Sequence, residues 1–277
     1  MPESDDDKGP GKLAKVMLWI GALLTAVVTA WLTDAFSLFL RPADLVSAAR
    51  PPLLVTVLPG TGAEQDLAVA SRPTAPRDRA VFLSGRFGDR AFDDVVATLK
   101  GAWVGEKEMR VVFESQRDLV RVTDVRVKEV APRQPIVTGA FVEHPRQGGP
   151  ANPQLTVSLD ARDAFFTQAG KPGRPYFGPH SLSLKRGDQA ELGLEIRARK
   201  HSHTFVLEVE YVVAGTGKAQ TVTVKDPAGR PFRVTGAPTA YTAYGTVYRN
   251  TGAGLKVVTG RAACRLFLPG RACTSAR

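Results

Sequence analysis

The chain has 277 residues, a formal net charge of +10 and only two cysteines. This length supports one large or two small domains with real hydrophobic cores, and it excludes a small scaffold held together mainly by disulfides. After residue 40 the chain contains 34 Lys and Arg against 22 Asp and Glu, so the excess of positive charge lies in that part.

Residues 16–40 form an apolar stretch that predicts a transmembrane helix. The first eighteen of these residues carry no charge, and in a helix they span roughly 27 Å, close to the thickness of a hydrocarbon core. Asp34 then belongs near one membrane interface, and Trp19 and Trp31 lie near the two ends, where amphipathic rings are favoured. The predicted partner of this segment is the lipid bilayer.

Basic residues near the two ends of this stretch predict its orientation. Lys8, Lys12 and Lys15 precede it, whereas Arg41 and Arg50 follow it, and an excess of basic residues favours the cytoplasmic side. We therefore expect a single-pass protein of the cell membrane, with a cytoplasmic N-terminus and an extracellular C-terminal domain.

Two alternatives stay open for the same stretch. Lys12 and Lys15, followed by Val28-Thr29-Ala30, loosely resemble a cleaved signal peptide, although the apolar run continues past that site and exceeds the length of a signal core. A buried helix of a soluble domain is the other alternative.

From residue 119 onward, apolar residues recur at every second position, which is the period of a half-buried strand. Residues 192–198 and 205–213 show this alternation most clearly, each with one polar face. Many short strands separated by Gly and Pro turns are typical of a sandwich. The predicted fold class is therefore mainly β, with an antiparallel, sandwich-like extracytoplasmic region.

Two local features refine this prediction. The alternation changes phase near Thr123 and Asp124, which indicates a β-bulge. Residues 226–229, DPAG, combine a proline of fixed φ with a glycine that tolerates positive φ. They predict a hairpin between residues 221–225 and 231–235.

One amphipathic helix is predicted after the membrane stretch, at residues 89–100. Phe92, Val95, Val96 and Leu99 recur at helical spacing and form a single apolar stripe. We divide the chain into a disordered cytoplasmic tail, the transmembrane helix, a proline-containing stalk, a small α+β portion and a β-sandwich-like domain, at residues 1–15, 16–40, 41–52, 53–115 and 116–277.

Cys264 and Cys273 are separated by eight residues that include a Leu-Pro-Gly turn. In an oxidising exterior such a pair predicts a disulfide. Closure of this loop would stabilise the fold by roughly 2–3 kcal/mol in a chain-entropy model.

His201 and His203 form an H-x-H pattern at the start of a predicted strand, where both imidazoles point to one face and can share a metal ion. The sequence does not indicate a third ligand, and the alternative is a polar turn that precedes Phe205. Asp160 and Asp163 lie close together in the sequence, and we expect an ordinary surface pair in a turn.

Motifs for other chemistry are missing from the sequence. It contains no G-x-S-x-G elbow and no S-x-x-K pattern, and its glycine-rich segments lack the strand-then-helix context of a phosphate-binding loop. We therefore expect no cofactor and no catalysis. The alternative is an accessory enzyme of the envelope, metal-assisted through His201 and His203.

Tyr241, Tyr244 and Tyr248 alternate with small residues, and Arg249 follows the last of them. Tyrosine and arginine together are typical of recognition surfaces, because both supply contact area at modest entropic cost. These four are the candidate binding residues. The alternative is a set of rings along a strand, with their hydroxyls at the rim of the sheet.

The positive charge of the C-terminal region predicts attraction to anionic envelope polymers, lipid headgroups or an acidic envelope protein. A solvated surface without a partner is the alternative. Nucleic acid is excluded, because the domain is expected outside the cell and its basic stretches are not interleaved with stacking aromatics.

Several stretches carry a family likeness: the lysine-preceded anchor, the helix at residues 92–99, and the segments VRVTDVRVKEV, GGPANPQLTVSLD and TVTVKDPAGRPFRVTG. With them the chain resembles uncharacterised single-pass membrane proteins of high-GC Gram-positive (actinobacterial) type, over most of its length. The resemblance implies no activity, ligand or functional residue. We therefore predict a non-enzymatic interaction or scaffold module of the cell envelope.

Overall fold

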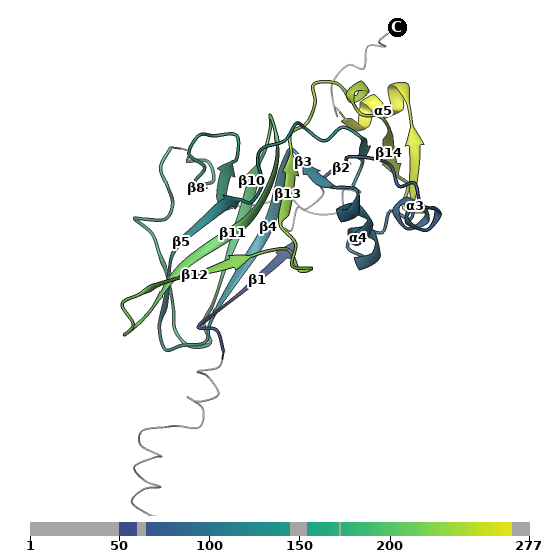
Figure 1. Ribbon diagram of the computed structural model, residues 1–277. Coiled ribbons are helices and arrows are strands. Elements are labelled where there is room, and N and C mark those ends of the chain that lie inside the picture. Colours follow the sequence, from purple (N-terminus) through teal and green to yellow (C-terminus); the bar gives the residue numbers. More distant parts are fainter. Residues whose placement is uncertain (1–49, 60–64, 145–153, 172, 268–277) are drawn as a thin grey trace, which may run out of the picture. The chain divides into compact units, whose positions relative to one another are not determined.

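The computed structural model describes residues 50–59, 65–144, 154–171 and 173–267 (Figure 1). Within these residues the chain is mainly β, as the alternating apolar positions predict. The strands form two sheets, and both are mixed, because parallel pairs occur in each of them beside a majority of antiparallel pairs.

The first sheet has five strands with β4 and β10 at its centre. Its order is β1 (Leu53–Pro59), β4 (Glu106–Ser115), β10 (Gln189–Arg197), β7 (Leu155–Ser158) and β8 (Thr167–Gln168). β10 is antiparallel to β4 and parallel to β7. The parallel pair brings the end of β7 beside the end of β10.

The second sheet has ten strands. It takes part in two lobes of the fold, one that contains the first sheet and one that contains the helices. Its order is β15 (Leu255–Val258), β14 (Val247–Asn250), β6 (Ala140–Val142), β2 (Leu67–Val69), β3 (Ala102–Val104), β13 (Phe232–Thr235), β11 (Ser202–Val213), β5 (Val120–Glu129) and β9 (Leu182–Leu184), while β12 (Ala219–Val224) also pairs with β11.

The larger hydrophobic core lies between the two sheets. Phe113 of β4 and Ile196 of β10 face it from the first sheet, and Phe205 and Leu207 of β11 face it from the second, all at 0% exposure. Alternate residues on these strands point the other way and are largely polar. The two-residue period of the sequence therefore reports which side of each sheet is buried.

The predicted β-bulge is confirmed. Along the β5–β11 ladder Asp124 pairs with Glu210, whereas Val122 pairs with Tyr211, so Thr123 is left without a ladder partner. The extra residue changes which side chains of β5 face the core, and this is the phase change that the sequence contains.

The DPAG turn is confirmed, but the predicted hairpin is wrong. The amide of Gly229 donates to the carbonyl of Asp226 over 2.8 Å, and Gly229 has φ of 77°. The flanking strands β12 and β13 do not pair with each other, because both pair with successive parts of β11. β11 has twelve residues, so one of its edges is long enough to pair with both β12 and β13.

The second lobe is built on strands β2, β6, β14 and β15, and both faces of its sheet are covered (Figure 1). The helices α3 (Pro76–Leu83) and α4 (Arg90–Thr98) cover one face, and η1 (Tyr241–Ala243) and α5 (Gly260–Phe267) cover the other. α4 is the predicted helix, and Phe92, Val95 and Leu99 are buried as expected.

Two residues that follow α4, Lys100 and Gly101, have distinct roles at its end. Lys100, with φ of 53°, takes the left-handed conformation that usually ends a helix. Gly101 is needed for a different reason, because a Cβ there would lie 2.3 Å from a methyl carbon of Val96.

The division into portions 53–115 and 116–277 does not follow the two lobes. β1 and β4 of the earlier portion belong to the larger core, whereas β6, β14, β15 and α5 of the later one belong to the helical lobe. From Pro52 onward the chain forms one compact unit.

The predicted transmembrane helix, at residues 16–40, lies outside the described residues. No helix within the described part of the chain is long and apolar enough to cross a bilayer.

Candidate metal centre

Both histidines of the H-x-H pattern lie at the beginning of β11. His203 is on the same side of the strand as the core residues Phe205 and Leu207, and its side chain is fully buried. His201 precedes the strand by one residue, and its side chain is 45% exposed. The strand therefore places one imidazole at the edge of the core and the other at the surface.

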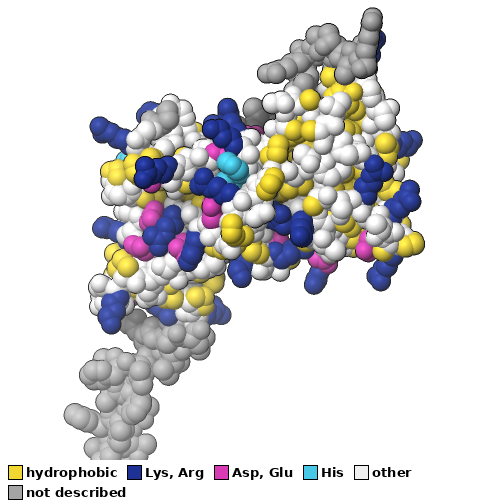
Figure 2. Space-filling model, turned by 45° about the horizontal axis from the view of Figure 1, so that its top comes forward, with side chains coloured by type: hydrophobic (Ala, Val, Ile, Leu, Met, Phe, Trp, Pro, Cys, Tyr) yellow, Lys and Arg dark blue, Asp and Glu magenta, His cyan; other side chains and the backbone are white. Residues whose placement is uncertain are grey.

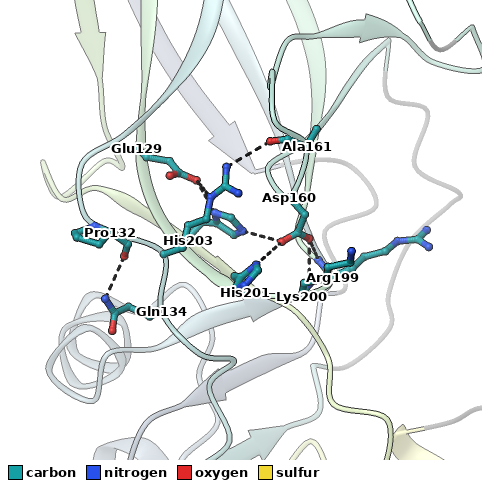
Figure 3. Close-up of polar contacts among 10 residues, drawn as sticks. Glu129, Pro132, Gln134, Asp160, Ala161, Arg199, Lys200, His201 and His203 are labelled. Carbon is teal, nitrogen blue, oxygen red and sulfur yellow. Dashed lines mark hydrogen bonds and ion pairs between the residues drawn. The ribbon is translucent and has the colours of Figure 1, made fainter.

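Asp160 reaches this position from the end of β7. The amide of Leu159 donates to the carbonyl of Arg197 over 2.9 Å, which continues the contact between β7 and β10. One carboxylate oxygen of Asp160, Oδ2, accepts hydrogen bonds from the backbone N–H groups of Arg199 and Lys200. This arrangement fixes the carboxylate and turns its other oxygen, Oδ1, toward the histidines (Figure 3).

Three potential ligand atoms converge at this point. Oδ1 of Asp160 lies 3.1 Å from Nδ1 of His201 and 3.3 Å from Nε2 of His203, and all three atoms lie within 4.8 Å of one another. Ligands at about 2.0–2.1 Å from a tetrahedral metal ion are about 3.3 Å apart. The two separations from Asp160 Oδ1 therefore match those between ligands of one ion.

Glu129, the last residue of β5, contacts the opposite side of the buried imidazole. Its carboxylate oxygen lies 2.6 Å from Nδ1 of His203. Nε2 is the nitrogen that faces Asp160, so when Nε2 serves as a metal ligand the N–H group is on Nδ1 and donates to Glu129. A histidine that binds a metal usually donates its second ring N–H to a carboxylate in this way.

Arg133 connects Glu129 to the segment that carries Asp160. Its Nε donates to the Glu129 carboxylate over 3.3 Å, and a terminal nitrogen donates to the carbonyl of Ala161 over 3.4 Å. Backbone hydrogen bonds between Gln134 and Ser202 hold the intervening segment beside β11. Three separate parts of the chain are thus joined around the two imidazoles.

The electrostatics of the centre favour an ionised Asp160. Burial acts to raise the pKa of Asp160, but the N–H groups of Arg199 and Lys200, together with His201 and His203, outweigh it and lower that pKa to about 2. The carboxylate is therefore charged at every pH at which a histidine can act as a metal ligand.

Asp163 and the other two histidines lie elsewhere in the fold. Asp163 is exposed and does not belong to this cluster. His144 packs against Phe87, with ring centroids 4.3 Å apart, and His180 stacks on Tyr176 at 4.8 Å. Within the part of the chain that the structure describes, the two H-x-H histidines and Asp160 form the group of potential metal ligands.

The four candidate binding residues are not brought together on one exposed surface. Tyr244 and Tyr248 are 6% and 5% exposed and pack on opposite faces of the sheet of the second lobe. Tyr241 is half-buried beside Tyr244, and Arg249 is exposed and pairs with Glu143 at 3.9 Å. Burial raises the pKa of Tyr244 above its usual range. Two of the three rings therefore contribute mainly to packing.

Cys264 lies in α5 and is buried, whereas Cys273 lies outside the described residues. The disulfide between them stays a prediction.

The H-x-H pattern indicates the two histidines, whereas the sequence predicts an ordinary surface pair at Asp160 and no role for Glu129. Asp160 and Glu129 are 43 and 74 residues from His203. The acidic residues at strand ends were visible, but only the pairing of β7 with β10 and of β5 with β11 places them here.

Comparisons with protein-family models, with curated proteins and with solved structures find no match to this chain.

Proposed function

We propose that this chain is a membrane-anchored module of the cell envelope whose folded, extracytoplasmic part binds one transition-metal ion. The observation that carries the metal-binding function is the convergence of Asp160 Oδ1, His201 Nδ1 and His203 Nε2 within 4.8 Å. The anchor is the predicted helix at residues 16–40, with the N-terminus in the cytoplasm and the sandwich-like region outside.

The chemistry of the ligands points to a class of metal. Two imidazoles and one carboxylate suit Zn²⁺ and neighbouring ions such as Co²⁺, Ni²⁺ and Fe²⁺. Mg²⁺ and Ca²⁺ prefer a shell made of oxygen atoms. Zn²⁺ is the ion that we expect to find in the purified protein.

The role that we propose for the module is interaction or scaffolding in the envelope, with anionic polymers or an acidic envelope protein as partners. Support comes from Lys and Arg side chains, which are spread over the surface and outnumber Asp and Glu in the view of Figure 2. Some of these cations already pair with acidic residues of the same chain, as Arg126 and Lys128 do with Glu208. The charge therefore favours anionic partners in general and does not select one of them.

An accessory enzyme of the envelope is the second candidate. It is favoured by one observation, the 45% exposure of the His201 side chain, because a centre with three protein ligands and access to solvent can activate a bound water molecule.

Metal analysis of the full-length protein tests the metal-binding proposal. We expect about one zinc ion per chain after removal of loosely bound metal, and we expect its loss in His201→Ala. His201 is the better first substitution, because its side chain is part exposed, whereas removal of the buried His203 also perturbs the core. His180→Ala is the matched control, since His180 is an exposed histidine outside the cluster. Zinc-free wild-type protein that takes up no zinc would overturn the proposal.

A further inference from the structure

The three candidate ligand side chains differ sharply in their exposure to solvent. The side chains of His203 and Asp160 are 0% and 10% exposed, whereas that of His201 is 45% exposed. An ion held by all three is therefore enclosed on the side of β11 and β7 and open on the side of His201.

The described residues supply three ligands to this group and not four. Glu129 does not serve as the fourth, because its carboxylate contacts Nδ1 of His203, on the far side of the ring from Nε2. Zinc sites with a purely structural role have four protein ligands, whereas sites with three leave a position for water or an external ligand. The open side of the centre is the place for that position.

The charges around the centre favour an anion at this position. Asp160 and Glu129 contribute two negative charges, and Arg133 already pairs with Glu129. Arg199 and Lys200 are exposed and flank Asp160 through their backbone N–H groups, and a divalent ion adds two further positive charges. The side chain of Arg199 extends away from the ligands, so it acts through the local field and not through contact (Figure 3).

We propose that the metal ion at Asp160, His201 and His203 keeps one coordination position for an external anionic oxygen donor, a phosphate or carboxylate group. This inference rests on the proposed metal-binding function. It names the chemistry by which the module engages an anionic partner: one oxygen of the partner completes the coordination shell, and the neighbouring cations attract the rest of its charge.

Cobalt substitution of the full-length protein provides the test. The visible absorption of bound Co²⁺ changes with its ligands, so inorganic phosphate and acetate are titrated separately at constant ionic strength. We expect a saturable spectral change with at least one anion. A change with phosphate alone assigns a phosphate group, and a change with acetate alone assigns a carboxylate.

The double variant Arg199→Ala, Lys200→Ala tests the contribution of charge. It keeps the backbone N–H groups that hold Asp160, so Co²⁺ binding should be unchanged, while anion affinity should fall about two- to fivefold, as expected for screened surface charges. Lys185→Ala, Lys218→Ala is the matched control, since both residues are exposed and lie near the opposite end of β11.

The outcomes separate the inference from the function on which it rests. Protein that binds no Co²⁺ contradicts the metal-binding function itself. Protein that binds one Co²⁺ but shows no spectral change with either anion contradicts only the proposal of an open coordination position, because a further group of the chain then completes the coordination shell. If the double variant at Arg199 and Lys200 binds the anion as tightly as the control double variant, these two residues do not contribute to anion affinity.

Discussion

Nδ1 of His203 lies 2.6 Å from a carboxylate oxygen of Glu129, a residue 74 positions earlier in the chain. This contact fixes the orientation of a fully buried imidazole at the beginning of β11, with Nε2 directed at Asp160. The imidazole of His203, at the edge of the core, is therefore oriented by a carboxylate group on each side.

Glu129→Gln should weaken metal binding without removal of any ligand. A neutral amide accepts a weaker hydrogen bond than a carboxylate and can also present its NH₂ group. The imidazole of His203 should therefore be oriented less firmly and be a less basic ligand. We expect zinc affinity to fall about 10- to 100-fold, as for other outer carboxylates of metal centres. Competition with a chelator measures the affinity, and Glu191→Gln, at an exposed position of β10, is the control. An unchanged affinity in Glu129→Gln would show that this contact does not act on the metal.

Stability should fall as the pH rises from about 5 to about 8, because of a carboxylate group on β4. Burial, followed by the hydrogen bond and the charge of Glu195, raises the pKa of Glu106 to about 7. A folded-state pKa above the unfolded one means that the folded protein binds the proton more tightly, so stability is lost on deprotonation.

Glu106→Gln, which imitates the protonated acid, should remove this part of the pH dependence. Urea unfolding of both proteins between pH 5 and pH 8 measures the difference, and the comparison cancels the titration of groups common to both. Parallel curves for wild type and variant would contradict the assignment to Glu106.

The helical lobe depends on the aromatic contact between its two N-terminal helices. Phe92 of α4 is 1% exposed and lies 6.0 Å from Phe82 of α3, centroid to centroid. Phe92→Ala should lower the free energy of unfolding by about 3–5 kcal/mol, through lost burial and the cavity that remains. Arg90→Ala, at an exposed position of the same helix, should change it by less than about 0.5 kcal/mol. Thermal and urea unfolding give both values, and similar losses in the two variants would contradict the packing described.

The proposed topology has a direct test. A reporter enzyme that is active only outside the cytoplasm, fused after Arg277, should be active in intact cells, because the basic residues before the predicted span favour a cytoplasmic N-terminus. A reporter that functions only in the cytoplasm serves as the opposite control. Activity of the second fusion alone would refute the anchored, extracytoplasmic account.

The sequence was most informative where one strand or helix carries its own periodic signal. The alternation in β10 and β11, the bulge at Thr123 and the apolar stripe of α4 all arise within about ten residues, and each prediction is confirmed. Two helices gave no such signal. α3 has one buried residue, Phe82, so it presents no apolar stripe, and the buried residues of α5 are the small Ala263 and Cys264, which are a weak apolar signal.

Features that depend on pairing between distant segments were not predictable. The sequence does not show that β12 and β13 share the edge of β11, or that β6 and β14 join the helical lobe. For the same reason the H-x-H pattern indicated two candidate ligands, while the third candidate, Asp160, required the parallel alignment of β7 with β10. Parallel neighbours are joined by long connections, and no local pattern reports their alignment.

X-ray absorption spectroscopy at the zinc edge of the zinc-loaded, full-length protein reports directly which atoms surround the ion. We expect a first shell of nitrogen and oxygen atoms at about 2.0–2.1 Å, with the outer scattering of two imidazoles, and the loss of one imidazole in His201→Ala. A sulfur shell at about 2.3 Å, or a shell of oxygen atoms without imidazole, would place the ion elsewhere and contradict the centre formed by Asp160, His201 and His203.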